Sequence, residues 1–241
     1  MKLFYKQWKK DINNIPNDAH VFGDNLLQFF NYDGDCYCPE INIIHKIINN
    51  DDNYFDFSKN LIDIGCEYGE YSYLLPFNYS YMFDGNKSKC IIAEFNMLLH
   101  NKENNYKCFN VLLSDNCESI LYNGWNTFGW GNNILDDGYT YDEYYNQESR
   151  ILDNYNLNNI GLIKIDVERM EEKVLRGGIG TIIRNNYPPI LFECFDIGKF
   201  NMTQEKHDSL QNFLEDLGYK IFWYYGDHET HLAIHKLQLD K

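Results

Sequence analysis

Two glycines and three carboxylates lie close together in the stretch LIDIGCEYGEYSYLL, residues 61–75. Asp63 falls within a short apolar run, and Gly65 and Gly69 follow it where an amphipathic helix begins. Glycines at these positions let the backbone turn sharply and approach a ligand closely. Glu67 stands where the dinucleotide fingerprint G-x-G-x-x-G has its second glycine, and its charge would repel a pyrophosphate. The pattern therefore favours a ligand without phosphate and disfavours a nicotinamide dehydrogenase.

A second apolar run, YSYMFDG (79–85), ends in a carboxylate. At the end of a strand next to the glycine turn, Asp84 can accept hydrogen bonds from both ribose hydroxyls of a nucleoside. The alternative is that Asp84, Gly85 and Asn86 form a plain turn. Together with the glycine turn, the run predicts a nucleoside site. S-adenosylmethionine is a nucleoside without phosphate that is positively charged at its sulfur and amine, so an acidic turn suits it.

Four further residues are candidates for the same cofactor. Ser114 and Asp115 end a third strand-like run, where they would contact the adenine. Tyr68 and Tyr71 lie inside or just after the glycine turn. Either tyrosine could pack on the methionine portion of the cofactor or only on the helix below it.

Charge interrupts a third motif, IGLIKIDVERMEEKVLRGG (160–178), where a buried strand should be apolar. Strand alternation directs Lys164, Asp166 and Glu168 to one face or to the mouth of the strand, and unpaired charges buried there would be costly. Such charges either pair with each other or serve a ligand. The alternative is a salt-bridged strand end that leads into a helix with acidic residues in its first turn, among them Glu171.

Methyl transfer to a hydroxyl needs an aligned acceptor and a group that removes its proton. Asp166 is our first candidate for that base, followed by Glu168 and Glu193. Lys164 could lower the pKa of the hydroxyl, hold Asp166 ionised, or form a structural ion pair. The three carboxylates could also converge on a hard cation such as magnesium, which we do not favour.

Two other segments could border the acceptor. The Gly-, Asn- and Trp-rich segment 123–133 is typical of a loop, and its Trp125 and Trp130 could stack on a sugar ring or join the core. His228 and His231 flank the turn of a predicted hairpin, where a histidine base would titrate near neutral pH. Simple surface exposure is the alternative for each histidine.

Strand-like runs alternate with helical patterns along the chain, which predicts an α/β fold: a mainly parallel sheet with helices on both faces. The last two strand candidates are joined by only residues 226–230, too few for a helical crossover, so they should form an antiparallel hairpin. That is the Rossmann-like sheet of a class I methyltransferase. The predicted strands are 61–65, 79–85, 106–115, 160–168, 188–196, 219–225 and 231–237, and the predicted helices are 41–48, 89–101, 171–185 and 204–218.

These motifs resemble those of the FkbM family of S-adenosylmethionine-dependent methyltransferases. The family's DIGxxxGxYS is similar to DIGCEYGEYS (63–72), and its IKIDVEGxExxVLxG is similar to IKIDVERMEEKVLRG (163–177). A P-x-I-L-x-E strand is matched by PPILFE (188–193), and a motif near FEP by FDG (83–85). The resemblance covers roughly residues 40 to 236, and the IKIDVE phrase is its most specific part.

The resemblance implies O-methylation, often of sugar hydroxyls on glycans, glycolipids or polyketide-type products, including nucleotide-sugars. Two positions depart from the family: Arg169 replaces a glycine, and Asp84-Gly85 replaces Glu-Pro but keeps the carboxylate. Arg169 leaves open a second class, a catalytically inactive cofactor-binding partner subunit. A third reading, methylation of an RNA cap or nucleoside, conflicts with the formal charge of -15 and the lack of a basic groove.

The length and composition of the chain limit the number of domains, the state of the cysteines and the class of protein. The 241 residues and 28.7 kDa suit one domain, which we place at 58–241, with residues 1–57 as an extension packed on it. The seven cysteines include no CxxC pair and are expected to be reduced thiols. No apolar run approaches the roughly 20 residues that span a bilayer. We therefore predict a cytoplasmic protein with a small-molecule or glycan acceptor, no nucleic-acid partner and an unspecified oligomeric state.

Overall fold

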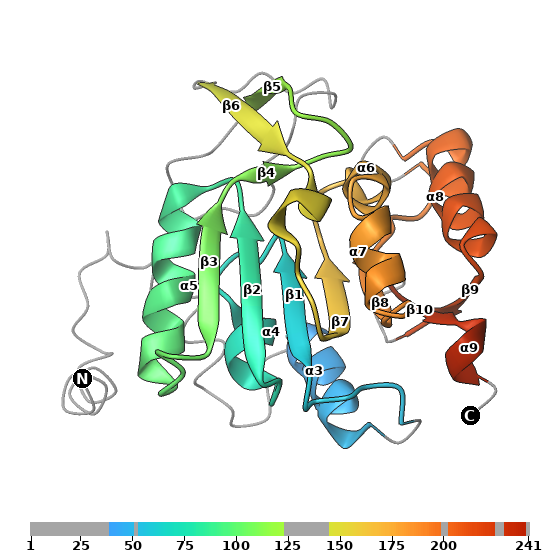
Figure 1. The fold of residues 1–241 in the computed structure, drawn as a ribbon. Coiled ribbons are helices and arrows are strands. Elements are labelled where there is room, and N and C mark those ends of the chain that lie inside the picture. The colour runs from blue at the N-terminus through green and yellow to red at the C-terminus, as the bar shows by residue number, and fades with distance from the viewer. Residues whose placement is uncertain (1–38, 51–52, 123–144, 199–201, 225–228, 240–241) are drawn as a thin grey trace.

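A seven-stranded sheet forms the centre of the molecule in the computed structural model, which describes residues 39–50, 53–122, 145–198, 202–224 and 229–239 (Figure 1). The strands lie in the order β3-β2-β1-β7-β8-β10-β9. This order places β1 and β7 beside each other at the centre. The bounds are β1 Asn60–Ile64, β2 Tyr79–Asp84, β3 Tyr106–Asn110, β7 Ile160–Ile165, β8 Ile190–Glu193, β9 Tyr219–Trp223 and β10 Thr230–His235.

Strand direction confirms the expected methyltransferase-like sheet. The pairs β1–β2, β2–β3, β1–β7 and β7–β8 are parallel, whereas β10 is antiparallel to both β8 and β9. The carboxyl ends of β1, β2, β3, β7 and β8 therefore meet at one edge, the upper edge of the sheet in Figure 1. In a doubly wound sheet that edge is where ligands bind.

Helices cover both faces of the sheet, as alternation along the strands requires. In β1, Leu61 joins the core cluster of one face and Ile62 that of the other, and in β7 Leu162 and Ile163 repeat the pattern. The first face carries α3 (Pro39–Asn49), α4 (Glu70–Leu74) and α5 (Lys87–Leu99); the second carries α6 (Glu171–Arg176), α7 (Ile179–Arg184), α8 (Gln204–Asp216) and the 3-10 turn η3 (Leu152–Tyr155), while α9 (Lys236–Leu239) follows β10.

The predicted strand at 106–115 is wrong in its extent. It divides at Val111, because β3 pairs with β2 but β4 (Leu112–Leu113) pairs with a different strand, β6 (Tyr145–Arg150). A second, three-stranded sheet of order β4-β6-β5 results, with β5 at Ser119–Tyr122. This small sheet lies above the carboxyl edge of the main sheet (Figure 1).

The predicted helix at 171–185 is also divided. It ends at Gly177 and restarts after Gly178, giving α6 and α7. A side chain could not replace the hydrogen at Gly177, because a Cβ there would lie 2.1 Å from the backbone oxygen of Ser114. The glycine pair thus lets the α6–α7 junction pack tightly against the end of β4.

The described part of the N-terminal extension packs on the core. Ile43, Ile44 and Ile47 of α3 are buried against Leu61 and Leu162 of the sheet. The remainder of 1–57, apart from 39–50 and 53–57, lies outside the described residues, and the proposed boundary at 57 stays a prediction. Within the described ranges, none of the helices has the length and apolar character needed to cross a membrane.

Candidate active site

The glycine turn connects β1 to α4 at the carboxyl edge and adopts left-handed backbone angles. Gly65 has φ 66°, Glu67 has φ 47°, and Gly69, the N-cap of α4, has φ 83°. A Cβ on Gly65 would lie 1.7 Å from the backbone oxygen of Asp166. Two separate reasons therefore require a glycine at position 65: its left-handed backbone conformation and the closeness of the loop that follows β7.

Asp63 and Lys164 are direct partners in the pairing of β1 with β7, and both point to the face covered by α4. The Nζ of Lys164 lies 3.9 Å from Oδ1 of Asp63 and 3.5 Å from Oδ2 of Asp166, and donates to the backbone oxygen of Gly65 at 2.8 Å. Ser72 donates to Asp63 at 2.7 Å. Burial raises the pKa of Asp63, although Lys164 opposes that shift. The pairing alternative for Lys164 is thus realised.

Lys164 ties the glycine turn to the candidate base. Burial alone would lower its pKa, but the carboxylates of Asp166 and Asp63 raise it above the ordinary value, so the ammonium stays charged. Its Nζ also lies 5.3 Å from the centre of the Tyr71 ring. Tyr71 is buried in the core on the α4 face, which matches the packing alternative predicted for it.

Asp84 ends β2 as predicted, and its carboxylate is held by the backbone. Oδ1 accepts from the N–H of Asn86 at 2.7 Å, and Oδ2 accepts from the N–H of Glu67 at 3.1 Å. Burial raises its pKa to about 6, against the opposing effect of Lys89. Asn86 caps α5 by accepting from the N–H groups of Ser88 and Lys89. The turn given as the alternative for Asp84, Gly85 and Asn86 is therefore present, and ribose binding by Asp84 stays a prediction.

Glu67 does not stand alone in the turn. Its Oε1 lies 3.2 Å from Nζ of Lys89, in the first turn of α5. Lys89 is 6% exposed, so this ion pair is largely removed from water on the lysine side. The sequence reasoning did not identify Lys89.

The candidate catalytic carboxylates gather after β7 and at the end of β8. The side chain of Asp166 is accessible, at 44% relative exposure. Burial and then Asp166 raise the pKa of Glu168 to about 7. Burial raises the pKa of Glu193 as well, with Asp166, Glu168 and Glu171 adding to the shift. Three carboxylates predicted from the sequence thus lie close enough to influence each other's protonation.

Glu171 shapes the loop that carries these carboxylates. Its Oε1 accepts from the N–H groups of Val167 and Arg169, and its carboxyl is buried. Burial raises the pKa of Glu171 to about 7. Glu168 and Arg169 both have positive φ, 56° and 77°. The glycine that the family places at position 169 is thus explained by a left-handed backbone conformation, which this chain fills with arginine.

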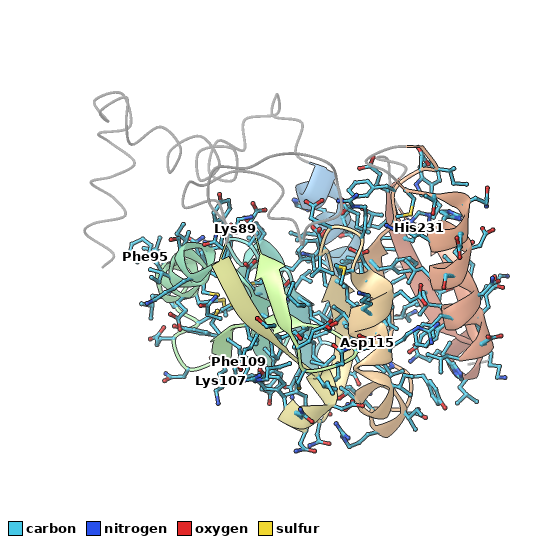
Figure 2. All side chains as sticks on the ribbon, turned by 90° about the horizontal axis from the view of Figure 1, so that it is seen from above. Lys89, Phe95, Lys107, Phe109, Asp115 and His231 are labelled. Atoms are coloured by element: carbon cyan, nitrogen blue, oxygen red, sulfur yellow. The ribbon has the colours of Figure 1, made fainter. Side chains whose placement is uncertain are left out.

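The remaining predicted cofactor residues lie along the same edge. Ser114 is fully buried at the end of β4 and donates to the exposed Asp115 at 3.2 Å. The backbone oxygen of Gly85 accepts from Asn110 of β3, and that of Tyr68 accepts from Asn96 of α5. Figure 2 looks onto this edge and shows Lys89 on the side of α5 and Asp115 nearer to α7. Their contacts with a cofactor stay predictions.

His231 lies in β10, where its ring stacks on Phe192 with centroids 5.5 Å apart and its Nδ1 lies 3.0 Å from the backbone oxygen of Glu229. Trp125, Trp130 and His228 lie outside the described residues. Among the residues that are described, no group of three or more His, Cys, Asp or Glu side chains is arranged to hold a metal ion. The geometry therefore adds no support for magnesium.

Strand order, the antiparallel β10 and the glycine turn together define a fold of the class I S-adenosylmethionine-dependent methyltransferases. Residues 63–221 match the family model described as the methyltransferase FkbM domain. The chain belongs to the FkbM methyltransferase family, as its motifs indicated.

Solved structures share this fold at low sequence identity. A methyltransferase FkbM from Methylobacillus flagellatus KT is 13% identical, with a TM-score of 0.55 over 75% of this chain and 44% of that chain. The chain thus spans less than half of that protein. An O-methyltransferase from Bacillus cereus in complex with SAH is 10% identical, with a TM-score of 0.49 over 95% of this chain and 96% of that chain. A search of curated proteins gives no match.

Proposed function

We propose that the protein is an S-adenosylmethionine-dependent O-methyltransferase that methylates a hydroxyl of a sugar in a glycan, glycolipid or nucleotide-sugar. The observation that carries the proposal is the meeting of three features at one edge of the sheet: the glycine turn, the Asp84 carboxylate and the accessible Asp166. The first two suit a nucleoside, and the third suits proton removal. The sugar acceptor comes from the family resemblance.

The residues present fit the cofactor. Asp84 already accepts two backbone N–H groups, and the second lone pair on each oxygen is left for a ribose hydroxyl. Gly65 and Gly69 adopt the positive φ values of the turn without the strain that a side chain would bring. Ser114 and Asp115 would lie at the adenine. When bound, S-adenosylmethionine supplies a methyl group already activated by its sulfonium.

Asp166 would take the proton of the acceptor hydroxyl. The hydroxyl oxygen forms a bond to the methyl carbon as the carbon–sulfur bond breaks, and the bonding electrons stay with sulfur, so the proton is the only species the protein must accept. Lys164, whose Nζ lies 3.5 Å from Oδ2 of Asp166, holds that carboxylate in place before the reaction. Glu168 could receive the proton next, because burial and Asp166 raise its pKa to about 7, and burial raises the pKa of Glu193 as well.

Two measurements test the proposal in order. Calorimetry with S-adenosylhomocysteine should give binding at micromolar concentration, and its complete absence would refute the cofactor assignment. Labelled S-adenosylmethionine should then transfer its methyl group to members of a panel of sugars, glycolipids and nucleotide-sugars. Binding without transfer to any sugar, but with transfer to capped RNA, would replace the acceptor class while keeping the methyltransferase.

A further inference from the structure

Lys89 is a buried cation beside the cofactor edge, in the first turn of α5 (Figure 2). A lysine there is unfavourable on two counts, since burial removes its water and the helix N-terminus carries a partial positive charge. Burial would lower its pKa, but the carboxylates of Glu67 and Asp84 raise it, so it remains an ammonium. A buried charge of this kind must be compensated by charged neighbours.

Lys89 acts on the two carboxylates Glu67 and Asp84 and also on Glu168 after β7, whose pKa it lowers. Its Nζ pairs with Glu67 at 3.2 Å, and the backbone N–H of Glu67 in turn donates to Asp84 at 3.1 Å. The side chain of Lys89 therefore fixes the residue whose backbone orients Asp84. Three groups from three elements are connected in this way: Glu67 from the glycine turn, Lys89 from α5 and Asp84 from β2.

The charge of Asp84 depends on the same lysine. Burial raises the pKa of Asp84 to about 6, and Lys89 and the two N–H donors oppose that shift, while Glu67 adds to it. The thiols of Cys66 and Cys90 also face this carboxylate. Because Lys89 is the cation acting on Asp84, its loss would let the carboxyl keep its proton at neutral pH. A protonated Asp84 accepts fewer hydrogen bonds from ribose hydroxyls.

We propose that Lys89 is a positioning residue for cofactor binding, which holds Glu67 in place and keeps the Asp84 carboxylate ionised and oriented toward the ribose hydroxyls. The inference rests on the proposed function in one respect, that the ligand is a nucleoside. A purely structural lysine, which only ties α5 to the turn, would also reduce binding when removed. The two roles differ in how binding depends on pH.

The test measures the affinity for S-adenosylhomocysteine by calorimetry between pH 5 and pH 8.5. In the wild type, affinity should fall as the pH drops through about 6, where Asp84 takes up a proton. Lys89→Met should weaken binding at pH 7 by about tenfold and move this midpoint upward by about one pH unit. Lys89→Arg should restore both values. Lys87→Met, an exposed lysine two positions earlier, is the matched control and should change neither.

Glu67→Gln supplies an independent arm, because it breaks the same ion pair from the other side. Removing the Glu67 charge should move the midpoint downward, opposite to Lys89→Met, whereas a structural tie would weaken binding in both variants without moving it. An unchanged midpoint in Lys89→Met and Glu67→Gln would overturn the proposal. If Lys89→Met fails to fold by circular dichroism, the direction in which Glu67→Gln moves the midpoint still decides it. If the wild type binds no S-adenosylhomocysteine at any pH, the proposed function fails instead.

Discussion

Carboxylates at the two halves of the carboxyl edge are held in opposite ways. At the ends of β1 and β2, Asp63 and Asp84 each accept hydrogen bonds from fixed donors, and a lysine faces each of them. After β7 and at the end of β8, Glu168 and Glu193 instead face other carboxylates, which raise their pKa values. Within the described ranges the buried Oε2 of Glu193 and the buried Oδ1 of Asp63 both lack a hydrogen-bond donor, but Asp63 Oδ1 has the Nζ of Lys164 at 3.9 Å.

In the proposed function, the carboxylates of β1 and β2 belong to cofactor binding and those after β7 and β8 to proton transfer, and the two environments fit these roles. A carboxylate whose donors are already in place can receive a ligand without rearrangement, which suits a cofactor site. Neighbouring carboxylates with raised pKa values can take up a proton, which suits the acceptor side of a reaction that releases one. Lys164 spans the boundary, since it contacts Asp63 on one side and Asp166 on the other.

The largest effect is expected from Gly65→Ala, because it acts on both halves at once. The added Cβ would collide with the backbone of Asp166 at a residue that already has φ 66°. We expect a loss of about 4 kcal/mol or more in the free energy of unfolding, measured with urea, and no binding of S-adenosylhomocysteine.

Gly198→Ala is the matched control for that substitution. Gly198 has φ 89°, but a Cβ there would have no atom within 4 Å. It should therefore cost only the conformational strain, about 1 kcal/mol. Equal losses in the two variants would mean that the approach of the β7 loop to the glycine turn is not what requires Gly65.

Asp166→Asn should distinguish the carboxylates proposed for proton transfer from those proposed for cofactor binding. We expect the methyl-transfer rate to fall by about 10²- to 10⁴-fold, the usual contribution of a general base, while the affinity for S-adenosylhomocysteine changes by less than about threefold. Glu172→Gln, which removes a carboxylate paired with Arg176 on the surface of α6, is the control and should keep full activity. A retained rate in Asp166→Asn would assign proton removal to another group, with Glu168 next in line.

The sequence predicted the cofactor half better than the acceptor half. Gly65, Asp84 and the strands that carry them follow from local patterns: an apolar run, a turn residue and a carboxylate at fixed spacing. The antiparallel pairing of β9 with β10 followed from the short connection between them. The division at Val111 could not be predicted, because Leu112 and Leu113 continue the apolar run and only the partner strand changes.

The sequence also did not predict contacts between residues that lie far apart along the chain. Glu67 and Lys89 meet only because α5 returns along the glycine turn, and nothing in their separation along the chain signals it. One sign was available: a lysine in the first turn of a helix opposes the helix dipole and calls for an acidic neighbour. Glu171 lies in the first turn of α6, as predicted, and its side chain also accepts from N–H groups of the preceding loop, a contact that the sequence did not indicate.

The pH dependence of the free energy of unfolding tests the buried carboxyl groups after β7. Glu171 is 2% exposed, and its pKa is raised to about 7 by burial. A carboxyl with a raised pKa stays protonated longer in the folded state than in the unfolded state. Its contribution is therefore present below about pH 4.5 and is lost as the pH rises through about 7, by up to about 3 kcal/mol.

Glu171→Gln should remove much of that fall while keeping an oxygen for the N–H groups of Val167 and Arg169. Urea unfolding at pH 5 and pH 8 should show a smaller difference for the variant than for the wild type. Glu205→Gln, in the first turn of α8, provides an exposed carboxylate for comparison and should leave the pH dependence as it is. A parallel fall in the wild type and in Glu171→Gln would show that burial of this carboxyl is not its source.

The smallest effect concerns Arg169, where this chain departs from the family glycine. Its φ of 77° is costly for a side chain with a Cβ, so Arg169→Gly should raise the free energy of unfolding by about 0.5 to 1 kcal/mol. Glu168→Gly relieves a similar angle, φ 56°, one position earlier, and separates backbone relief from loss of the arginine. If Arg169→Gly destabilises the protein while Glu168→Gly stabilises it, the arginine side chain contributes contacts that outweigh the strain.

Because Arg169 also lowers the pKa of Glu168, Arg169→Gly should move the acidic limb of the rate profile to higher pH. That shift would place arginine 169 among the groups that set proton transfer on the acceptor side.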